Sequence, residues 1–242
     1  MSIPMIEKLA GYGCDGIRTP IRGLDIAQLI DNGNLADFLP NTSSIAIMDP
    51  VPVGARTATT HAELRHFIVN EFDLSRFGVG EGCRVAVLLP NGPEIAVCIL
   101  SLISRWCAAP INATNTMHEI KSELESTKAL AIVVMKGVAT NEVAIEAALS
   151  LQLGVIMLHH SELKTGLFSL TLHTPPPEEA ATTGSSIAQI NDGFKAYSHP
   201  ETVLLLHTSG TSGNKKCVPY SLDMILVGVG SIISSWNLVP SG

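Results

Sequence analysis

The order of structural elements is clearest in residues 83–135, CRVAVLLPNGPEIAVCILSLISRWCAAPINATNTMHEIKSELESTKALAIVVM. Apolar runs of strand length at 83–90 and 129–135 enclose two segments of helix length and a shorter strand in APINAT. A continuous apolar run bounded by turn residues is typical of a strand buried on both faces. Strands that alternate with helices predict an α/β protein, with a layered, mixed and mainly parallel sheet flanked by helices.

Local signals mark where the helices begin. Thr60 and Glu63 have capping-box spacing before LRHFIVNEF, and Thr116 and Glu119 repeat that spacing before IKSELESTK. A further helix is expected in NEVAIEAALSLQ, before a strand at 154–160.

Turn residues follow the two strands of the opening stretch. Pro93 suits the first position of a helix that ends near Trp106, and Asn91 is a candidate cap for it. Asn112 is expected to order the turn after APINAT.

Composition changes along the chain predict its division. We expect further buried strands at 44–49 and 202–208, and a helix at SLDMILVGVGSIISSW. The expected parts are an irregular N-terminal segment (1–43), an α/β subdomain (44–172), a Pro- and Ser-rich surface connection (173–200) and an incomplete second subdomain (201–242) that contains a strand, a loop and a helix.

Composition bounds the class of protein. The 242 residues are 46% hydrophobic and 15% charged, which suits a folded chain. The net charge of -7 argues against a nucleic-acid partner, whose binding face is normally basic. The cysteines form no CxxC pair and no zinc pattern, which suits a reducing compartment: Cys14, Cys83, Cys98, Cys107 and Cys217. We therefore expect a cytoplasmic location, with a peroxisomal one as the alternative.

Two apolar stretches fall short of a membrane span. Arg105 interrupts residues 94–110, and Asp223 with several serines and glycines interrupts residues 222–239. We interpret both as buried helices and expect no membrane span. The N-terminus has no apolar core of signal-peptide length.

Several short motifs match a functional pattern only in part. Gly11, Gly13 and Gly16 match GxGxxG without the preceding strand that a dinucleotide site needs, and the glycines of 78–82 predict a turn. His61 and His66, like the His159–His160 pair, lack metal-ligand spacing. Neither GxSxG nor the Walker pattern is present.

Residues 204–219, LLLHTSGTSGNKKCVP, carry the chemistry. Gly210 and Gly213 permit positive φ, so that successive backbone N–H groups can turn inward and bind an anion. Lys216, and with it Lys215, offers a flexible positive charge suited to a polyphosphate. Hydroxyl groups that can follow phosphate oxygens come from Thr208, Ser209, Thr211 and Ser212. The alternative is a polar hairpin connection.

HTSGTSGNKKCV resembles the phosphate loop of the adenylate-forming superfamily, which includes acyl-CoA synthetases and nonribosomal peptide synthetase adenylation domains. That loop usually reads Thr-Ser-Gly-Thr-Thr-Gly-x-Pro-Lys-Gly-Val, so that Lys216 matches the family lysine. Two positions depart from it, because Lys215 replaces a proline and Cys217 a glycine. The nucleotide-binding residues that the resemblance implies are Thr208, Ser209, Gly210, Thr211, Ser212, Gly213, Asn214, Lys215 and Lys216. The segment TTHAELRHFI and residues 78–134 are also similar to the family.

The resemblance implies ATP-dependent activation of a small carboxylic acid. An acyl adenylate forms with release of pyrophosphate, and the acyl group then passes to CoA or a phosphopantetheine carrier. Mg2+ would accompany the ATP, with Thr211 as a candidate residue beside it.

The resemblance also implies where the catalytic residues lie. In the family they follow the phosphate loop, so we expect them downstream of Gly242, the last residue of the sequence. The chain would then be an N-terminal portion that needs the C-terminal portion for activity. The alternative is a non-catalytic α/β module with weak or no nucleotide binding.

Overall fold

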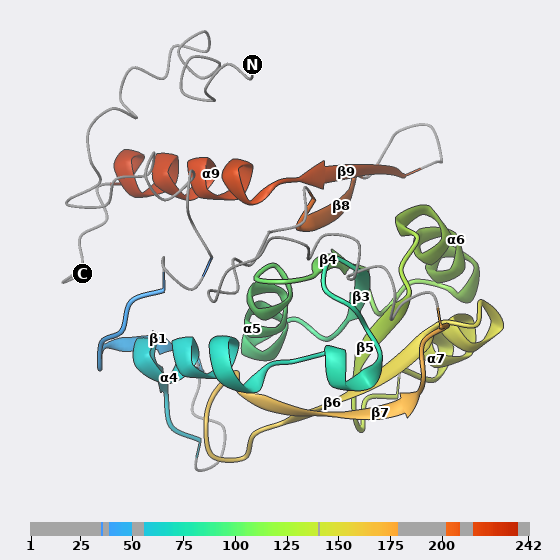
Figure 1. Ribbon diagram of the computed structural model, residues 1–242, viewed down its shortest axis with the longest axis horizontal. Coiled ribbons are helices and arrows are strands. Elements are labelled where there is room, and N and C mark those ends of the chain that lie inside the picture. Colours follow the sequence, from blue (N-terminus) through green and yellow to red (C-terminus); the bar gives the residue numbers. More distant parts are fainter. Residues whose placement is uncertain are drawn as a thin grey trace, which may run out of the picture.

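Most of the structure is one seven-stranded sheet with helices beside it (Figure 1). This computed structural model describes residues 35, 39–49, 56–139, 141–178, 202–208 and 215–236. The strands of the sheet, in spatial order, are β7 (Phe168–Thr174), β6 (Gly154–His160), β5 (Ala131–Met135), β3 (Arg84–Leu88), β4 (Cys107–Pro110), β8 (Leu204–Thr208) and β9 (Lys216–Tyr220).

The five inner strands of this sheet are parallel and both outer strands are antiparallel. Parallel pairs join β6 to β5, β5 to β3, β3 to β4 and β4 to β8. The outer strands β7 and β9 pair antiparallel with β6 and β8. The mixed, mainly parallel sheet predicted from the sequence is therefore confirmed.

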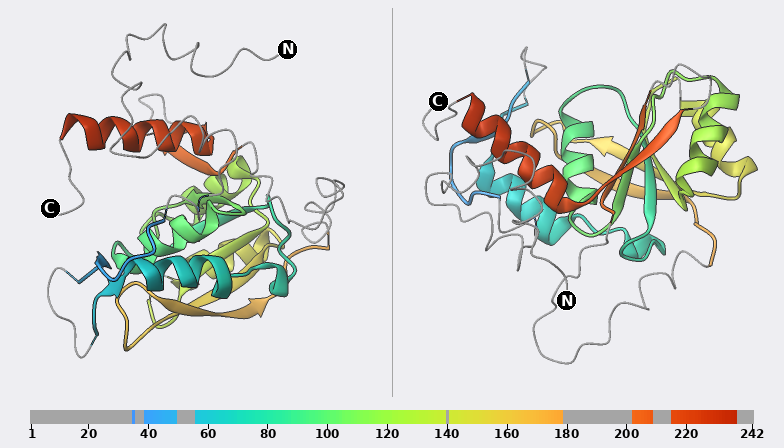
Figure 2. Two further views of the ribbon diagram at one scale, coloured as in Figure 1. Left: turned by 60° about the vertical axis from the view of Figure 1, so that its left-hand side comes forward. Right: turned by 90° about the horizontal axis from the view of Figure 1, so that it is seen from above.

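Alternate residues of the inner strands point into two apolar cores, one on each face of the sheet. On β3, Val85 and Val87 pack with α5 (Pro93–Leu102), whereas Ala86 and Leu88 pack with α6 (Met117–Thr127) and α7 (Asn141–Ser150). Each of these four side chains is fully buried. Helices consequently cover both faces, as the view from above shows (Figure 2), and both faces gain from apolar burial.

The predicted capping boxes are both present. Thr60 accepts from Glu63 N at the start of α4 (His61–His66), and Thr116 accepts from Glu119 N at the start of α6. In each box the glutamate also accepts from the backbone N–H of the threonine at 2.9 Å. These reciprocal bonds satisfy N–H groups that the first turn of a helix leaves free.

The structure corrects two expectations about α5. Pro93 occupies the predicted first position, but the cap is Gly92, which has no side-chain oxygen, and not Asn91. The helix ends at Leu102 instead of near Trp106, and the Trp106 indole, buried in the core, donates from Nε1 to Val79 O at 3.1 Å. Asn112 does order the turn after β4, since its Oδ1 accepts from Thr114 N at 3.0 Å.

The N-terminal part of the predicted α/β region forms a small separate sheet. β1 (Ile45–Ile47) pairs antiparallel with β2 (Thr59–Thr60), and the Ile45 side chain is exposed. The expectation of a buried strand at 44–49 was therefore wrong, because a two-stranded ribbon cannot cover both faces of its strands. After α4 the chain continues through the π-helical turn η2 (Phe67–Glu71) and the 3-10 turn η3 (Ser75–Phe77). Gly78 (φ 83°) and Gly82 (φ 80°) then form the predicted turn before β3.

The last described helix, α9 (Leu222–Ser235), is only half covered. Leu222 and Leu226 join the core, but Met224, Val229 and Ile232 are exposed. The expectation that both apolar stretches form buried helices is thus right for α5 and wrong for α9, because only one side of α9 meets the core. Among the helices that the structure describes, none combines the length and apolarity needed to cross a bilayer.

Candidate phosphate-binding hairpin

The segment predicted to bind phosphate, residues 204–219, contains both strands of a hairpin, except for the last residue of β9. β8 and β9 pair in register from Leu204↔Tyr220 to Thr208↔Lys216. Thr208 and Lys216 therefore face each other where the strands end, and Thr208 Oγ1 lies 3.5 Å from Lys216 O.

Part of the predicted site lies outside the described residues. This holds for Ser209, Gly210, Thr211, Ser212, Gly213 and Asn214, and so for the candidate magnesium position Thr211. Gly242, beyond which the catalytic residues are expected, lies outside them as well. The structure therefore places Thr208, Lys215 and Lys216 of the predicted nucleotide-binding set, and the location of the catalytic residues stays a prediction.

The base of the hairpin is held in the sheet. Ala108 N donates to Val203 O at 2.9 Å, and Ala108 is in register with Leu204. Val203 is fully buried and Leu205 nearly so. β8 therefore delivers its last residue, Thr208, to the end of the sheet where parallel strands present their carboxyl termini, the edge at which α/β sheets bind ligands.

The two lysines after the loop have different surroundings. Lys215 Nζ lies 2.5 Å from Glu123 Oε1 on α6. This hydrogen bond to a carboxylate raises the pKa of Lys215 above its usual range, so the ammonium is charged at neutral pH. Lys216 is exposed and begins β9, and its ammonium forms no ion pair with any residue that the structure describes. Of the two, Lys216 has the ammonium that is available to an incoming anion.

Glu123 is the centre of a polar cluster that the sequence did not reveal. Its side chain is only 7% exposed, and Asn115 Nδ2 donates to Oε1 at 2.9 Å. On the other oxygen, His207 Nδ1 lies 3.5 Å from Glu123 Oε2. The other ring nitrogen of His207, Nε2, is 3.0 Å from Ser126 Oγ. These contacts bring α6 against the end of β8 and the residue before β9.

One weak sequence signal accompanied this cluster. Glu119 and Glu123 lie four residues apart, so they share a stripe of α6 that adjoins the stripe of the buried Ile120 and Leu124. That pattern is equally typical of a solvated helix face. Glu123 and Lys215 are separated by 92 positions in the sequence, so spacing arguments could not predict their contact.

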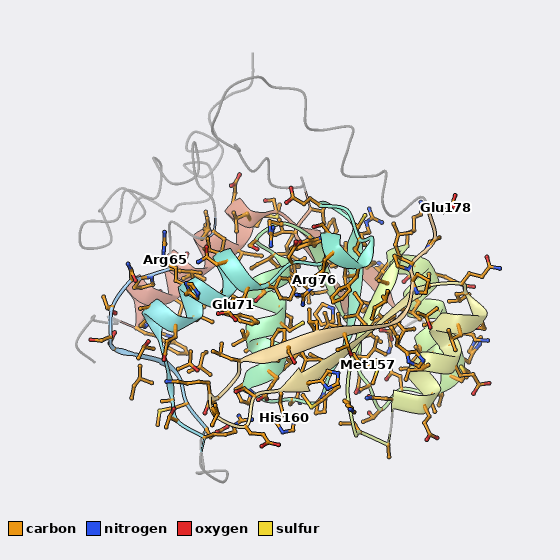
Figure 3. The ribbon with its side chains drawn as sticks, turned by 60° about the horizontal axis from the view of Figure 1, so that its bottom comes forward. Arg65, Glu71, Arg76, Met157, His160 and Glu178 are labelled. Atoms are coloured by element: carbon orange, nitrogen blue, oxygen red, sulfur yellow. The ribbon has the colours of Figure 1, made fainter. Side chains whose placement is uncertain are left out.

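No three His, Cys, Asp or Glu side chains of the described residues could share a metal ion. His159 Nε2 lies 2.8 Å from Thr171 Oγ1 across the β6–β7 pair, and His160 follows at the exposed end of β6 (Figure 3). Burial raises the pKa of Cys98 to about 12 and that of Cys107 to about 11, so neither thiol is an active nucleophile at neutral pH.

The fold and the hairpin define the class of protein: a mixed α/β protein whose sheet carries a glycine- and hydroxyl-rich connection beside an exposed lysine. The chain belongs to a particular family within that class. Residues 73–240 match the family described as AMP-binding enzyme.

Two curated relatives are named as an acyl-CoA synthetase and a CoA ligase. The chain is 31% identical over 181 residues to acyl-CoA synthetase ALT10 of Alternaria alternata. The aligned region covers 69% of this chain and 32% of that protein. It is 26% identical over 217 residues to oxalate–CoA ligase of Arabidopsis thaliana. That aligned region covers 88% of this chain and 40% of the ligase. The chain thus spans well under half the length of these relatives.

Solved structures agree on the fold. The apo structure of MatB from Rhodopseudomonas palustris superposes with a TM-score of 0.57 at 22% identity, over 86% of this chain and 38% of that chain. Its ATP-bound form superposes with a TM-score of 0.56 at 21% identity. The family match over residues 73–240, and not these structures, confirms the expected relation to the adenylate-forming enzymes.

Proposed function

We propose that this chain is the part of an ATP-dependent carboxylate-activating ligase that holds the nucleotide phosphates. The overall reaction is formation of an acyl adenylate, followed by thioester formation with CoA or a carrier thiol. The observation that carries this proposal is the sequence TSGTSGNKK on the β8–β9 hairpin of a chain that belongs to the AMP-binding family. The names of the two relatives, an acyl-CoA synthetase and a CoA ligase, support it.

In this proposal the hairpin binds the β- and γ-phosphates of ATP. Backbone N–H groups at Gly210 and Gly213, with the hydroxyls around them, donate to phosphate oxygens. Lys216 adds a charge on a flexible stem, which suits a polyphosphate whose geometry changes when pyrophosphate leaves. Mg2+ beside Thr211 would neutralise further phosphate charge.

The location of the remaining catalytic parts is also a proposal. The matched region covers 32% and 40% of the two curated relatives, and we propose that the complete reaction needs residues downstream of Gly242. The half-exposed apolar helix α9 supports this, since a further part of such an enzyme would cover it. The predicted boundary between 44–172 and 201–242 stays a proposal, and it runs through the seven-stranded sheet, because β8 pairs with β4. A cytoplasmic location stays a proposal as well.

The same coverage supports a second candidate function. By itself the chain would then be a non-catalytic α/β module of the family, with weak or no nucleotide binding. The two candidates agree on the fold and differ in whether ATP binding by the chain depends on the hairpin and its Lys216.

Titration with MgATP, followed by calorimetry, separates these candidates. We expect weak binding that Lys216→Met reduces about tenfold, as for loss of one charge-assisted contact. Lys136→Met, at an exposed position outside the hairpin, is the matched control and should bind as the unaltered chain does. Equal affinities of Lys216→Met and the control would contradict the phosphate role.

A further inference from the structure

The cluster around Glu123 has no part in the chemistry proposed above, yet it holds a carboxylate and an imidazole that are both mostly buried. Glu123 and His207 are each only 7% exposed at their side chains, whereas Lys215 is 38% exposed. A carboxylate removed from water needs charged or hydrogen-bonding partners. Lys215 and Asn115 supply them at Oε1, at 2.5 Å and 2.9 Å.

The ion pair with Glu123 limits what Lys215 can do. If its ammonium moved to a phosphate, the Glu123 carboxylate would keep, among the described residues, only Asn115 and the more distant His207 ring. Loss of the cation from a carboxylate that is only 7% exposed is costly, because the remaining charge stays out of water. Lys215 is therefore better suited to fix the hairpin to α6 than to bind a ligand.

The hairpin separates the two lysines in space as well. Cys217 packs with Cys107 and Ala109 of β4, and Ile111, two residues further on, belongs to the core beneath α6. Side chains alternate along an extended chain. Residues 215 and 217 consequently share the face toward α6, and Lys216 points to the opposite face.

We propose that Lys215 is a positioning residue, which ties the hairpin to Glu123 of α6 so that Lys216 meets the phosphates of the nucleotide. The contact lies where the chain enters β9, opposite Thr208 (Figure 1, hairpin β8–β9 beside α6). It constrains the start of the strand whose first residue is Lys216. This inference rests on the proposed function.

A MgATP titration tests the inference, because the inference predicts that Glu123→Gln lowers the affinity and does not raise it. We expect Lys215→Met and Glu123→Gln each to weaken binding about fivefold, as for coupling through a neighbouring group. The double variant should be no weaker than the weaker single variant, because both changes break one ion pair. Lys215→Arg should keep the affinity within about twofold of the unaltered chain, because arginine can also pair with the carboxylate.

A higher affinity of Glu123→Gln would overturn the inference. It would mean that the carboxylate competes with ATP for Lys215, and that Lys215 itself binds phosphate. Failure of Lys215→Arg to keep that affinity would also count against a positioning role through Glu123.

Amide hydrogen exchange without ATP provides a separate measurement. We expect Lys215→Met to speed exchange at the open end of the hairpin, near Thr208 and Lys216, and Lys216→Met to leave it unchanged. Unchanged exchange in Lys215→Met would contradict the positioning role alone. Absence of ATP binding to the unaltered chain would instead contradict the proposed function, so the two failures are distinguishable.

Discussion

Arg56 Nη1 donates to Glu94 Oε1 at 2.7 Å and thereby joins the segment before β2 to the first turn of α5. The same guanidinium donates from Nη2 and Nε to Asp49, at 2.9 and 3.1 Å. Asp49 also accepts from Thr165 Oγ1 at 2.8 Å, so that this network links four separate segments. All three charged side chains are about nine-tenths buried.

Replacement of Arg56 should destabilise the fold strongly. Arg56→Met leaves the Asp49 and Glu94 carboxylates without their cation, and we expect the free energy of unfolding to fall by about 3–5 kcal/mol. Urea unfolding followed by circular dichroism measures this loss. Lys136→Met removes an exposed cation and should change stability by no more than about 0.5 kcal/mol. A similar small change for Arg56→Met would show that the network contributes little.

Loss of the Leu102 side chain should leave a cavity between α5 and the sheet. Leu102 is fully buried, and we expect Leu102→Ala to lower the free energy of unfolding by about 2–5 kcal/mol. Leu149→Ala on α7 truncates the same side chain at an exposed position and is the matched control. Equal denaturation midpoints for the two variants would contradict the packing described for α5.

The capping box of α6 should contribute to the stability of the helix that carries Glu123. Thr116→Ala removes the acceptor for Glu119 N and should cost about 1 kcal/mol. Thermal unfolding is a suitable measurement. Ser43→Ala is the control, because it also removes a hydroxyl but at an exposed position outside the helices and strands. Unfolding temperatures that match in the two variants would argue against a stabilising role for the cap.

The Glu63 carboxylate should make stability depend on acid. Its hydrogen bond to Lys164, together with the Thr60 backbone N–H, lowers the pKa of Glu63 from 4.5 to about 2. A carboxylate whose pKa falls on folding stabilises the protein above its unfolded pKa. That contribution is lost as the pH falls from about 4.5 to about 2.

Stability measured across this pH range checks the assignment. Glu63→Gln should be less stable than the unaltered chain at about pH 7, and the difference should shrink below about pH 4. Glu146→Gln, exposed on α7, should show no such pH-dependent difference. A constant gap between Glu63→Gln and the unaltered chain from about pH 7 to about pH 3 would refute the prediction.

Much of the fold was predictable because its signals are local. Both capping boxes join residues three apart, and Pro93 acts through its own ring. Two strands of the main sheet were not predicted. In β7, Phe168 and Leu170 are buried and alternate with exposed residues, a short pattern that a loop can also show. In β9, Pro219 argues against an inner strand, but an outer strand tolerates it.

The candidate site divides in the same way. Its glycines, hydroxyls and lysines stand side by side in the chain, so their order alone indicated a phosphate-binding segment and the family. The different surroundings of Lys215 and Lys216 could not be predicted from that segment, since they depend on a carboxylate 92 residues away. The same applies to α9, whose apolar residues predicted burial on all sides while the core covers only one.

Residue order thus accounts for most of the elements, the two capping boxes and the kind of chemistry, because each arises from groups a few bonds apart along the backbone. Folding in three dimensions settled which faces are covered, that β1 stays apart from the main sheet, and which lysine is paired. Those outcomes depend on contacts between distant segments, whose energies exist only once the chain has brought them together.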